Sequence, residues 1–380
     1  MNDLATVPAH TADQESSVVD RLIALAVRGL QPMFDQHRQL FCYKLKKNES
    51  GMVQEGISQR YTMMTLLGLY RLEQSGKVSP FDSGRILETL FSDLSWIDNI
   101  GDLGLFLWLC STVCPERLPE IGSKLDIADA LVRYRGAKDG VTMELAWFLT
   151  GICYWGLARP EKLAELKPVA LETYQMLVKN QGERGFFGHL CTSRSFMGMI
   201  RGRIGSFADQ VYPIYAFTQL FRAYEHEEAA KRALKCAVGI CEVQGPLGQW
   251  WWHYDAVHGK VTDGYPVFSV HQHAMAPMTL FALGDAIGYD FDPYIYKGLN
   301  WINTNNELNF EMEDSSAGVI WRCIQRSGSS RMRYLKARLG RHQDAHQDAL
   351  RHTGGRELQV LFECRPYELG WLLYAFASRT

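Results

Sequence analysis

Hydrophobic residues recur along this chain with the 3.6-residue period of α-helices, and one predicted helix follows another with very little strand. Some predicted helices are apolar around most of their circumference, which is typical of interior helices. These are residues 60–75, 141–158, 209–226 and 269–287. Amphipathic segments between them suit an outer layer: residues 18–34, 81–94, 117–134, 161–179 and 229–243. The alternation predicts two concentric rings of helices.

An internal repeat marks the loops that follow two of the outer helices. Residues 181–187 and 244–250 both read Q-x3-G-x-aromatic, and a weaker echo at 305–310 has Asn in place of both Gln and Gly. The spacing is about sixty residues, the length of one helical hairpin with its loops. Six such units would nearly fill the chain.

The Q-x3-G-x-W pattern resembles the QW repeat of the squalene-hopene cyclase and protein prenyltransferase superfamily, whose members are α/α toroids. The resemblance covers about residue 60 to the C-terminus. It implies an all-α fold, an (α/α)6 toroid with inner and outer helix rings. It also implies that the motif residues tie adjacent hairpins together and are structural; they are Gln181, Gly185, Gln244, Gly248 and Trp250.

The catalytic motifs of that superfamily do not carry over. The nearest match to DxDD is Asp290-Phe291-Asp292-Pro293, in which proline takes the last place and Asp292 is better explained as a helix N-cap. No DDxxD motif and no recognisable zinc-ligand set is present in the sequence. A shared fold therefore leaves the function open.

Length and composition indicate a globular protein of one large domain or two ordinary ones, and the repeat pattern favours a single toroid. Of 380 residues, 47% are hydrophobic and 22% charged, enough for a large core. We expect a polar tail at residues 1–17, a single toroid domain at 18–380, and a basic excursion at about 326–356. The excursion holds eight Arg or Lys against two Asp. The formal net charge of -2 gives no reason to expect nucleic acid as a partner.

Targeting signals are not visible. The N-terminus has no basic and apolar signal regions, and the longest apolar run, 103–110, is far shorter than the ~20 residues of a membrane-spanning helix. Nine cysteines without a CxxC pair suggest reduced core thiols. We therefore predict a soluble, cytoplasmic protein without a transmembrane segment.

Residues 244–273 carry the richest chemistry, with three consecutive tryptophans, histidines and aspartates. Neighbouring side chains point in different directions, so three adjacent indoles cannot all face one core. Trp250 fills the repeat position. Trp251, Trp252, His253 and Asp255 remain, and they combine an aromatic platform with an imidazole and a carboxylate, which indicates substrate contact.

The (α/α)6 architecture is also that of six-hairpin glycosidases, uronyl hydrolases, epimerases and several polysaccharide lyases, whose sites lie where the inner helices begin. That resemblance directs attention to polar residues in the first turns of the predicted inner helices. They are Arg60, Tyr61, Glu144, Asp209, Gln210, His271, Gln272, His273, Tyr367 and Glu368.

Each of these residues also has a structural explanation. Asp209 could cap its helix, although a carboxylate in that apolar segment would be desolvated, which suits a general acid. His271 and His273 point about 200° apart on a regular helix, so one of them contacting substrate is a better hypothesis than a shared metal. We predict no cofactor and no metal.

Two charged groups lie near the C-terminus. Glu311, Glu313 and Asp314 are expected to be acidic first-turn residues of a helix. Arg322, in an expected apolar helix, needs either a carboxylate partner or an anionic ligand. Glu363, Arg365 and Glu368 form a compact group that could supply that partner.

These observations favour a carbohydrate-active enzyme that cleaves, eliminates or epimerises a sugar unit by acid–base chemistry. The expected acid and base are Asp209 with either Asp255 or one of the two histidines His271 and His273. His253 and Glu368 are further candidate catalytic residues. Expected substrate-binding residues are Arg60, Tyr61, Tyr212, Trp251, Trp252 and Arg322. Two alternatives stay open: a terpenoid cyclase-like enzyme acting on an isoprenoid with a different acid, and a non-catalytic binding or scaffold toroid.

Overall fold

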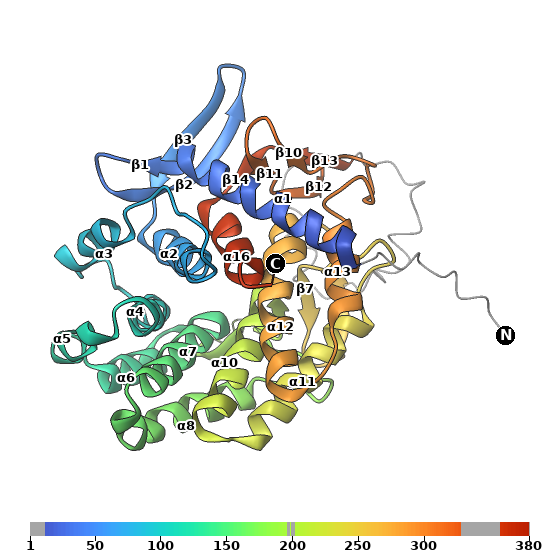
Figure 1. The fold of residues 1–380 in the computed structure, drawn as a ribbon. Helices are drawn as coiled ribbons and strands as arrows, with labels where there is room; N and C mark the ends of the chain where they lie inside the picture. The colour runs from blue at the N-terminus through green and yellow to red at the C-terminus, as the bar shows by residue number, and fades with distance from the viewer. Residues whose placement is uncertain (1–11, 196–197, 199–201, 328–357, 380) are drawn as a thin grey trace.

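The chain is an α/α toroid in the computed structural model, which describes residues 12–195, 198, 202–327 and 358–379 (Figure 1). The first eleven residues of the predicted tail and residues 328–356 of the predicted basic excursion lie outside this description. No described helix is long and apolar enough to cross a membrane.

Six largely buried helices form the inner ring, and each packs against the next in chain order until the last returns to the first. They are α2 (Gln59–Gln74), α4 (Ile100–Val113), α7 (Thr142–Ala158), α10 (Ala208–Tyr224), α12 (Ala276–Ile287) and α16 (Pro366–Phe376). The predicted interior helices are among them. The inner helix α4 is not among the predicted helices, because it is apolar on all sides and its residues 103–110 therefore show no 3.6-residue alternation.

An outer helix precedes each inner one, as the alternation predicted. The outer helices are α1 (Ala12–Leu30), α3 (Ser83–Ser92), α5 (Leu118–Lys124) with α6 (Ile127–Gly136), α8 (Leu163–Lys179), α11 (Glu227–Glu242) and α13 (Asp292–Asn300). The predicted helix 117–134 is two helices, since Asp126 caps α6 and thereby starts a new one. Asp292 is the first residue of α13 and not its N-cap.

The inner ring closes between the two ends of the chain, where α16 packs against α2. A Cβ atom on Gly68 would lie 2.0 Å from the carbonyl oxygen of Gly370, and one on Gly370 would lie 2.6 Å from Cα of Thr65. Only glycine allows two helix backbones to approach this closely. The ring can therefore close with these helices in direct backbone contact.

Short strands are more frequent than the sequence suggested, with fourteen in the described part of the chain. They are β1 (Phe34–Asp35), β2 (Leu40–Asn48), β3 (Gly51–Ile57), β4 (Asp139–Val141), β5 (Leu190–Ser193), β6 (Ile204–Ser206), β7 (His253–Asp255), β8 (Lys260–Asp263), β9 (Val267–Phe268), β10 (Glu313–Asp314), β11 (Val319–Ile320), β12 (Cys323–Arg326), β13 (Leu358–Leu361) and β14 (Glu363–Cys364). Most have two to four residues, too few for the alternation of a strand to be recognised.

These strands lead the chain into the inner helices. β3, β4, β6 and β14 each end within two residues of an inner helix, and β9 ends shortly before η4 (His271–Met275), a π-helical turn that continues into α12. Antiparallel pairing of β14 with β2 joins the two ends of the chain a second time. The β2–β3 hairpin projects beyond the helices (Figure 1).

The repeat found in the sequence is also a structural repeat. The Gln181 amide donates to carbonyl oxygens in its own turn and in α11, and Gln244 makes the equivalent bonds to its own turn and to α13. Gly185 and Gly248 have φ of 96° and 98°, and Asn309 of the weaker echo has φ of 47°. Each loop thus has the same left-handed turn, so the predicted structural role of the glutamines and glycines agrees with their contacts.

None of the nine cysteines forms a disulfide bond, and eight are buried while Cys191 is partly exposed. The cytoplasmic location stays a prediction.

The closure of the ring predicts a large effect of one methyl group. Gly370→Ala should lower the free energy of unfolding by about 3 kcal/mol, because its Cβ atom would overlap the α2 backbone. Gly84→Ala is the matched control, since its Cβ would meet nothing closer than 3.4 Å and stability should stay within about 1 kcal/mol. Urea unfolding of both variants measures the difference, and equal stability would contradict the closure argument.

Candidate active site

The first turns of the inner helices meet at one end of the ring, which we call the mouth. Arg60 on α2 binds Asp102 on α4, with 2.7 Å between Nε and Oδ1. Asp209 on α10 accepts a hydrogen bond from the backbone N–H of Met143 on α7 at 3.2 Å. The rings of Tyr61 on α2 and Tyr367 on α16 lie 4.6 Å apart. The polar first-turn residues therefore gather at one end, as the sequence predicted.

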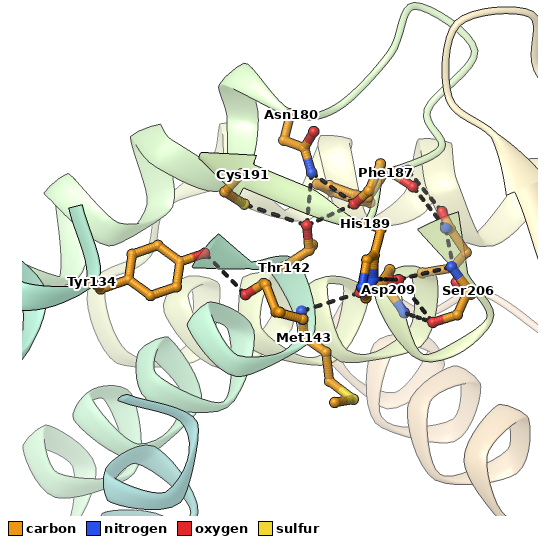
Figure 2. Close-up of polar contacts among 12 residues, drawn as sticks. Tyr134, Thr142, Met143, Asn180, Phe187, His189, Cys191, Ser206 and Asp209 are labelled. Atoms are coloured by element: carbon orange, nitrogen blue, oxygen red, sulfur yellow. Dashed lines mark hydrogen bonds and ion pairs between the residues drawn. The ribbon is translucent and has the colours of Figure 1, made fainter. Parts of the chain in front are cut away.

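Asp209 is fully buried and held by several donors (Figure 2). Ser206, at the end of β6, donates its backbone N–H and its hydroxyl to Oδ2, at 2.7 and 2.8 Å. The Met143 N–H reaches Oδ1, and His189 Nδ1 lies 2.9 Å from Oδ2. These contacts fix the orientation of the carboxylate, so Asp209 acts as the anchor for a histidine. The capping role that the sequence offered for Asp209 is wrong, because α10 begins at Ala208 without a side-chain cap and the Asp209 N–H itself donates to the Ser206 hydroxyl at 3.3 Å.

His189 is the exposed member of this pair, with 46% of its side-chain surface accessible. Its backbone is anchored from α7, because its carbonyl oxygen accepts from the Thr142 N–H at 2.9 Å. The Thr142 hydroxyl donates to the Gly188 carbonyl, and the Asn180 amide donates to both groups. Sequence reasoning missed His189, since it lies in a loop and starts no helix.

Two further carboxylates lie beside this pair. Burial raises the pKa of Glu144, and the nearby Arg60 offsets only part of that effect. Burial also raises the pKa of Asp102, despite its ion pair with Arg60. Glu144 packs closely on α4, since a Cβ on Gly101 would lie 2.8 Å from its side chain. The mouth therefore contains a half-buried carboxyl group, that of Glu144, whose pKa is raised.

Aromatic rings lie beneath these charges. The Trp371 indole N–H donates to the Tyr212 hydroxyl at 3.0 Å, and the rings of Trp147 and Tyr212 lie 5.0 Å apart. The Arg60 guanidinium lies 5.4 Å from the Trp147 ring. Tyr212 is buried, so it supports the mouth from below and is not the open platform predicted for it.

An ion-pair cluster forms the wall near α16. Arg322 Nε lies 3.0 Å from Glu363, and Nη1 hydrogen-bonds Glu368. Burial raises the pKa of Glu368, and Arg322 opposes that effect. Arg365 donates to the Tyr61 hydroxyl at 2.9 Å. Arg322 lies between strands and not in a helix, but its expected carboxylate partner is present, so Glu368 and Arg322 neutralise each other.

The acidic segment before Arg322 is likewise a hairpin, β10–β11, and not the start of a helix. Glu313 is buried there and forms an ion pair with Arg21 of α1. The cluster Glu311, Glu313 and Asp314 is therefore structural in this arrangement.

The three tryptophans divide between core and mouth. Trp250 and Trp251 are buried, and the Trp251 indole donates to the Val243 carbonyl at 2.7 Å. Trp252 is half-buried and stacks on His253 with 4.5 Å between ring centres. His253 pairs with Ser206 across β6 and β7, next to the anchor of Asp209. Trp252 and His253 therefore flank the site, whereas Trp251 is positioned to pack and not to bind a sugar.

Asp255 does not lie beside Asp209. In the β6–β7 pairing Asp255 lies opposite Ile204, whereas His253 lies opposite Ser206, which is two residues closer to α10. The Asp255 carboxylate accepts from the backbone N–H groups of Val257 and His258 at 2.8 and 3.1 Å. His258 Nδ1 lies 2.7 Å from the same carboxylate. These contacts close the β7–β8 turn, so the pairing of Asp255 with Asp209 as acid and base is not supported by their positions.

His271 and His273 lie in the π-helical turn η4 and are buried. Burial lowers the pKa of each to about 3, which leaves both neutral. His271 Nδ1 lies 3.3 Å from the Trp250 carbonyl oxygen, and its ring packs 4.4 Å from Phe207. Both histidines therefore lie in the core and not on the surface of the mouth, contrary to the role expected from the sequence.

No group of three or more His, Cys, Asp or Glu among the residues that the structure describes is arranged to hold a metal ion.

Comparison with solved structures shows what the fold resembles. An unsaturated glucuronyl hydrolase specific for heparin has a TM-score of 0.57 at 12% identity, covering 96% of both chains. A possible member of the GH105 family from Klebsiella pneumoniae has a TM-score of 0.60 at 12% identity, covering 99% of this chain and 96% of that one. The unsaturated glucuronyl hydrolase from Bacillus sp. GL1, responsible for glycosaminoglycan degradation, has 0.58 at 14%, covering 96% and 95%.

These likenesses establish the six-hairpin α/α toroid over nearly the whole chain. No protein-family model matches the sequence, and no curated protein matches it. The resemblance to terpenoid cyclases gains no support from the structural neighbours described above.

The buried histidines predict a pH-dependent stability. As pH falls below 6.5, the unfolded histidine binds a proton while the folded one, with a pKa of about 3, does not. The contribution of each neutral buried histidine to the free energy of unfolding is therefore fully present above pH 6.5 and is lost as the pH falls toward 3. At about pH 5 the loss is roughly 2 kcal/mol per histidine. His273→Leu should remove one such loss, measured by urea unfolding at about pH 7 and about pH 5.

His37→Leu serves as the control, because His37 is exposed. Its pH dependence should equal that of the unsubstituted protein. If His273→Leu kept the full loss as well, the assignment of the loss to the buried imidazole would be wrong.

Proposed function

We propose that this chain is a carbohydrate-active enzyme that hydrolyses a saccharide carrying an acidic sugar unit, by acid–base catalysis at the mouth. The observation that carries the proposal is the exposed His189 bound to the buried Asp209, with the half-buried Glu144 on the adjacent helix. An imidazole and a carboxyl group placed beside each other in this way suit proton transfer to and from one substrate.

His189 would act as the proton-transferring imidazole and Asp209 as its orienting partner. A carboxylate that accepts from an imidazole fixes its tautomer and stabilises the charge that the ring gains on taking a proton. Asp209 is fully buried, so substrate would meet the exposed His189. Four donors to Asp209 prevent it from turning away, which keeps the pair aligned.

Glu144 would supply the proton to the leaving group. A general acid must be protonated near the working pH, and burial raises the pKa of Glu144 in that direction. Among the residues described, no hydrogen-bond donor occupies its carboxyl group, which leaves that group available to a substrate oxygen. His189 and Glu144 are close enough to interact electrostatically.

Arg60 would bind the acidic substituent of the sugar. Its Nε atom is engaged by Asp102, while its guanidinium is oriented over Trp147. A guanidinium held in this way can still bind a carboxylate through its outer nitrogens. Trp252, half-buried beside His253, offers a ring face to the apolar side of a sugar.

The structural neighbours support the substrate class. Two of them are unsaturated glucuronyl hydrolases by name, and their likeness covers nearly the whole of this chain. The substrates of those two enzymes, heparin and glycosaminoglycan, guide the first assay. The polar mouth also argues against an isoprenoid cyclase, whose cavity would be almost entirely aromatic or aliphatic; here Arg60, Asp102, Glu144, His189 and Asp209 lie together.

Proton transfer can be tested with substitutions that keep side-chain shape. Asp209→Asn and Glu144→Gln should each lower kcat by about 10²–10⁴-fold, because each removes a group needed for proton transfer. The assay measures release of the unsaturated glucuronyl unit from glycosaminoglycan-derived disaccharides. Release is monitored through the loss of the ultraviolet absorbance of the double bond. If Glu144 is the acid, activity should fall as pH rises through its raised pKa.

Glu161→Gln is the matched control, since Glu161 lies just after the far end of α7, about 25 Å from Glu144 along the helix. Its activity should equal that of the unsubstituted protein. Full activity of both Asp209→Asn and Glu144→Gln on a confirmed substrate would overturn the assignment.

Binding of the acidic group gives a separate prediction. Arg60→Gln should raise KM for the acidic disaccharide by about tenfold or more, since a charge-assisted hydrogen bond contributes about 1.5–3 kcal/mol. The change in kcat should be smaller. Arg159→Gln, at the far end of α7, should leave KM unchanged. An unchanged KM for Arg60→Gln would show that another group binds the acid.

A further inference from the structure

A cavity of about 530 Å³ lies outside the inner ring. Its wall is built from the end of α8 with the turn that follows, strand β5, the residues just before β6, and the turn between β7 and β8. Asn180, Cys191, Arg203 and Val257 represent these four segments. Asp209, His189 and Glu144 do not line it. Its volume is within the range of small-molecule sites.

The charge of the lining favours an anion. Lys179 and Arg203 both line the cavity and are exposed, and neither forms an ion pair with another described residue. None of the described lining residues is Asp or Glu. Two unneutralised cations at one cavity attract a carboxylate or phosphate.

The remaining polar groups suit a hydroxylated ligand. Thr192 lines the cavity, and its hydroxyl oxygen is buried without a hydrogen-bond partner among the described residues. A rotation of the Thr192 side chain about χ1 would turn this hydroxyl into the cavity, where a ligand hydroxyl would supply the missing hydrogen bond. The amides of Asn180 and Gln181 also line the cavity, although the Asn180 amide already donates to Thr142 at 2.7 Å.

The cavity lies beside the candidate active site, because Cys191 lines the cavity and contacts Thr142, which also holds the His189 segment (Figure 2). Cys191 Sγ lies 3.4 Å from the Thr142 hydroxyl, and the Thr142 N–H holds the carbonyl of His189. Residues 189 and 191 are two apart in the chain, and the first reaches Asp209 while the second lines the cavity. A ligand in the cavity would therefore lie one side chain away from the segment that carries His189.

We propose that this cavity is a second ligand site, specific for a carboxylated sugar, with Lys179 and Arg203 binding the carboxylate and the Thr192 hydroxyl binding a sugar hydroxyl. The ligand is either a free sugar acid or a further unit of the acidic saccharide that the mouth would cleave; only this second source rests on the proposed function. Binding can be measured without any hydrolysis.

Cys191 provides a reporter for this cavity. The other eight cysteines are buried, so a small neutral alkylating reagent should modify Cys191 first. Burial raises the pKa of its thiol to about 11, so the reaction with iodoacetamide should be followed at about pH 9, where a small thiolate fraction exists. Intact-mass spectrometry gives the rate, and Cys191→Ser should take up no label.

A sugar acid in the cavity should protect the thiol. Sodium D-glucuronate at about ten times its Kd should slow alkylation about tenfold, whereas D-glucose and sodium acetate at equal concentration should not. Protection should vanish in the Lys179→Gln/Arg203→Gln variant, whose two substituted side chains are exposed, so that its fold is retained. Rates are compared with each variant's own ligand-free rate, and circular dichroism checks folding.

Asp209→Asn distinguishes this site from the mouth, since protection should persist in that variant while hydrolysis is lost. An unsaturated glucuronyl disaccharide protects Cys191 better than glucuronate if the ligand is a longer saccharide, and no better if it is the free acid. Three results would each overturn the proposal, whatever the hydrolysis assay shows. They are protection by glucose equal to that by glucuronate, no protection by glucuronate or by the unsaturated disaccharide, and no alkylation of Cys191 in the ligand-free protein.

Discussion

The ring of inner helices depends on one backbone contact, the approach of α16 to α2 at Gly370 and Gly68. These helices come from opposite ends of the chain, so the contact converts a row of hairpins into a closed ring. The pairing of β14 with β2 closes the same junction at the mouth. Because closure brings α2 beside α16, it also brings Tyr61 of the first inner helix to Tyr367 and Arg365 of the last.

Closure also explains the concentration of carboxylates at the mouth. All inner helices begin there, and the N-terminus of a helix carries partial positive charge that stabilises acidic side chains in its first turn. Asp102, Glu144, Asp209 and Glu368 occupy such positions on four inner helices. The same field would favour an anionic substrate. Arg60 and Arg322 neutralise two of these carboxylates, which leaves Glu144 and the His189–Asp209 pair for the proposed proton transfer.

Short strands turn this charged ring into a defined site. β6 delivers Ser206 to Asp209, and the β4–β5 pairing, with Thr142, places His189 against the same carboxylate. Strands of two to four residues have little pattern of their own, since they exist because a neighbouring segment offers a partner. The sequence therefore indicated Asp209 but not His189, and it suggested Asp255, which closes its own turn with His258.

The sequence by itself determined the ring of helical hairpins and the polarity of its mouth, because both follow from local patterns: the 3.6-residue period, the repeated Gln and Gly turns, and polar first-turn residues. Tertiary structure alone decided which of those residues are accessible. His271, His273, Trp251 and Tyr212 are buried and His189 is exposed, since burial depends on packing between segments far apart in the chain. A single sequence contains the composition of each segment but not the identity of its neighbours.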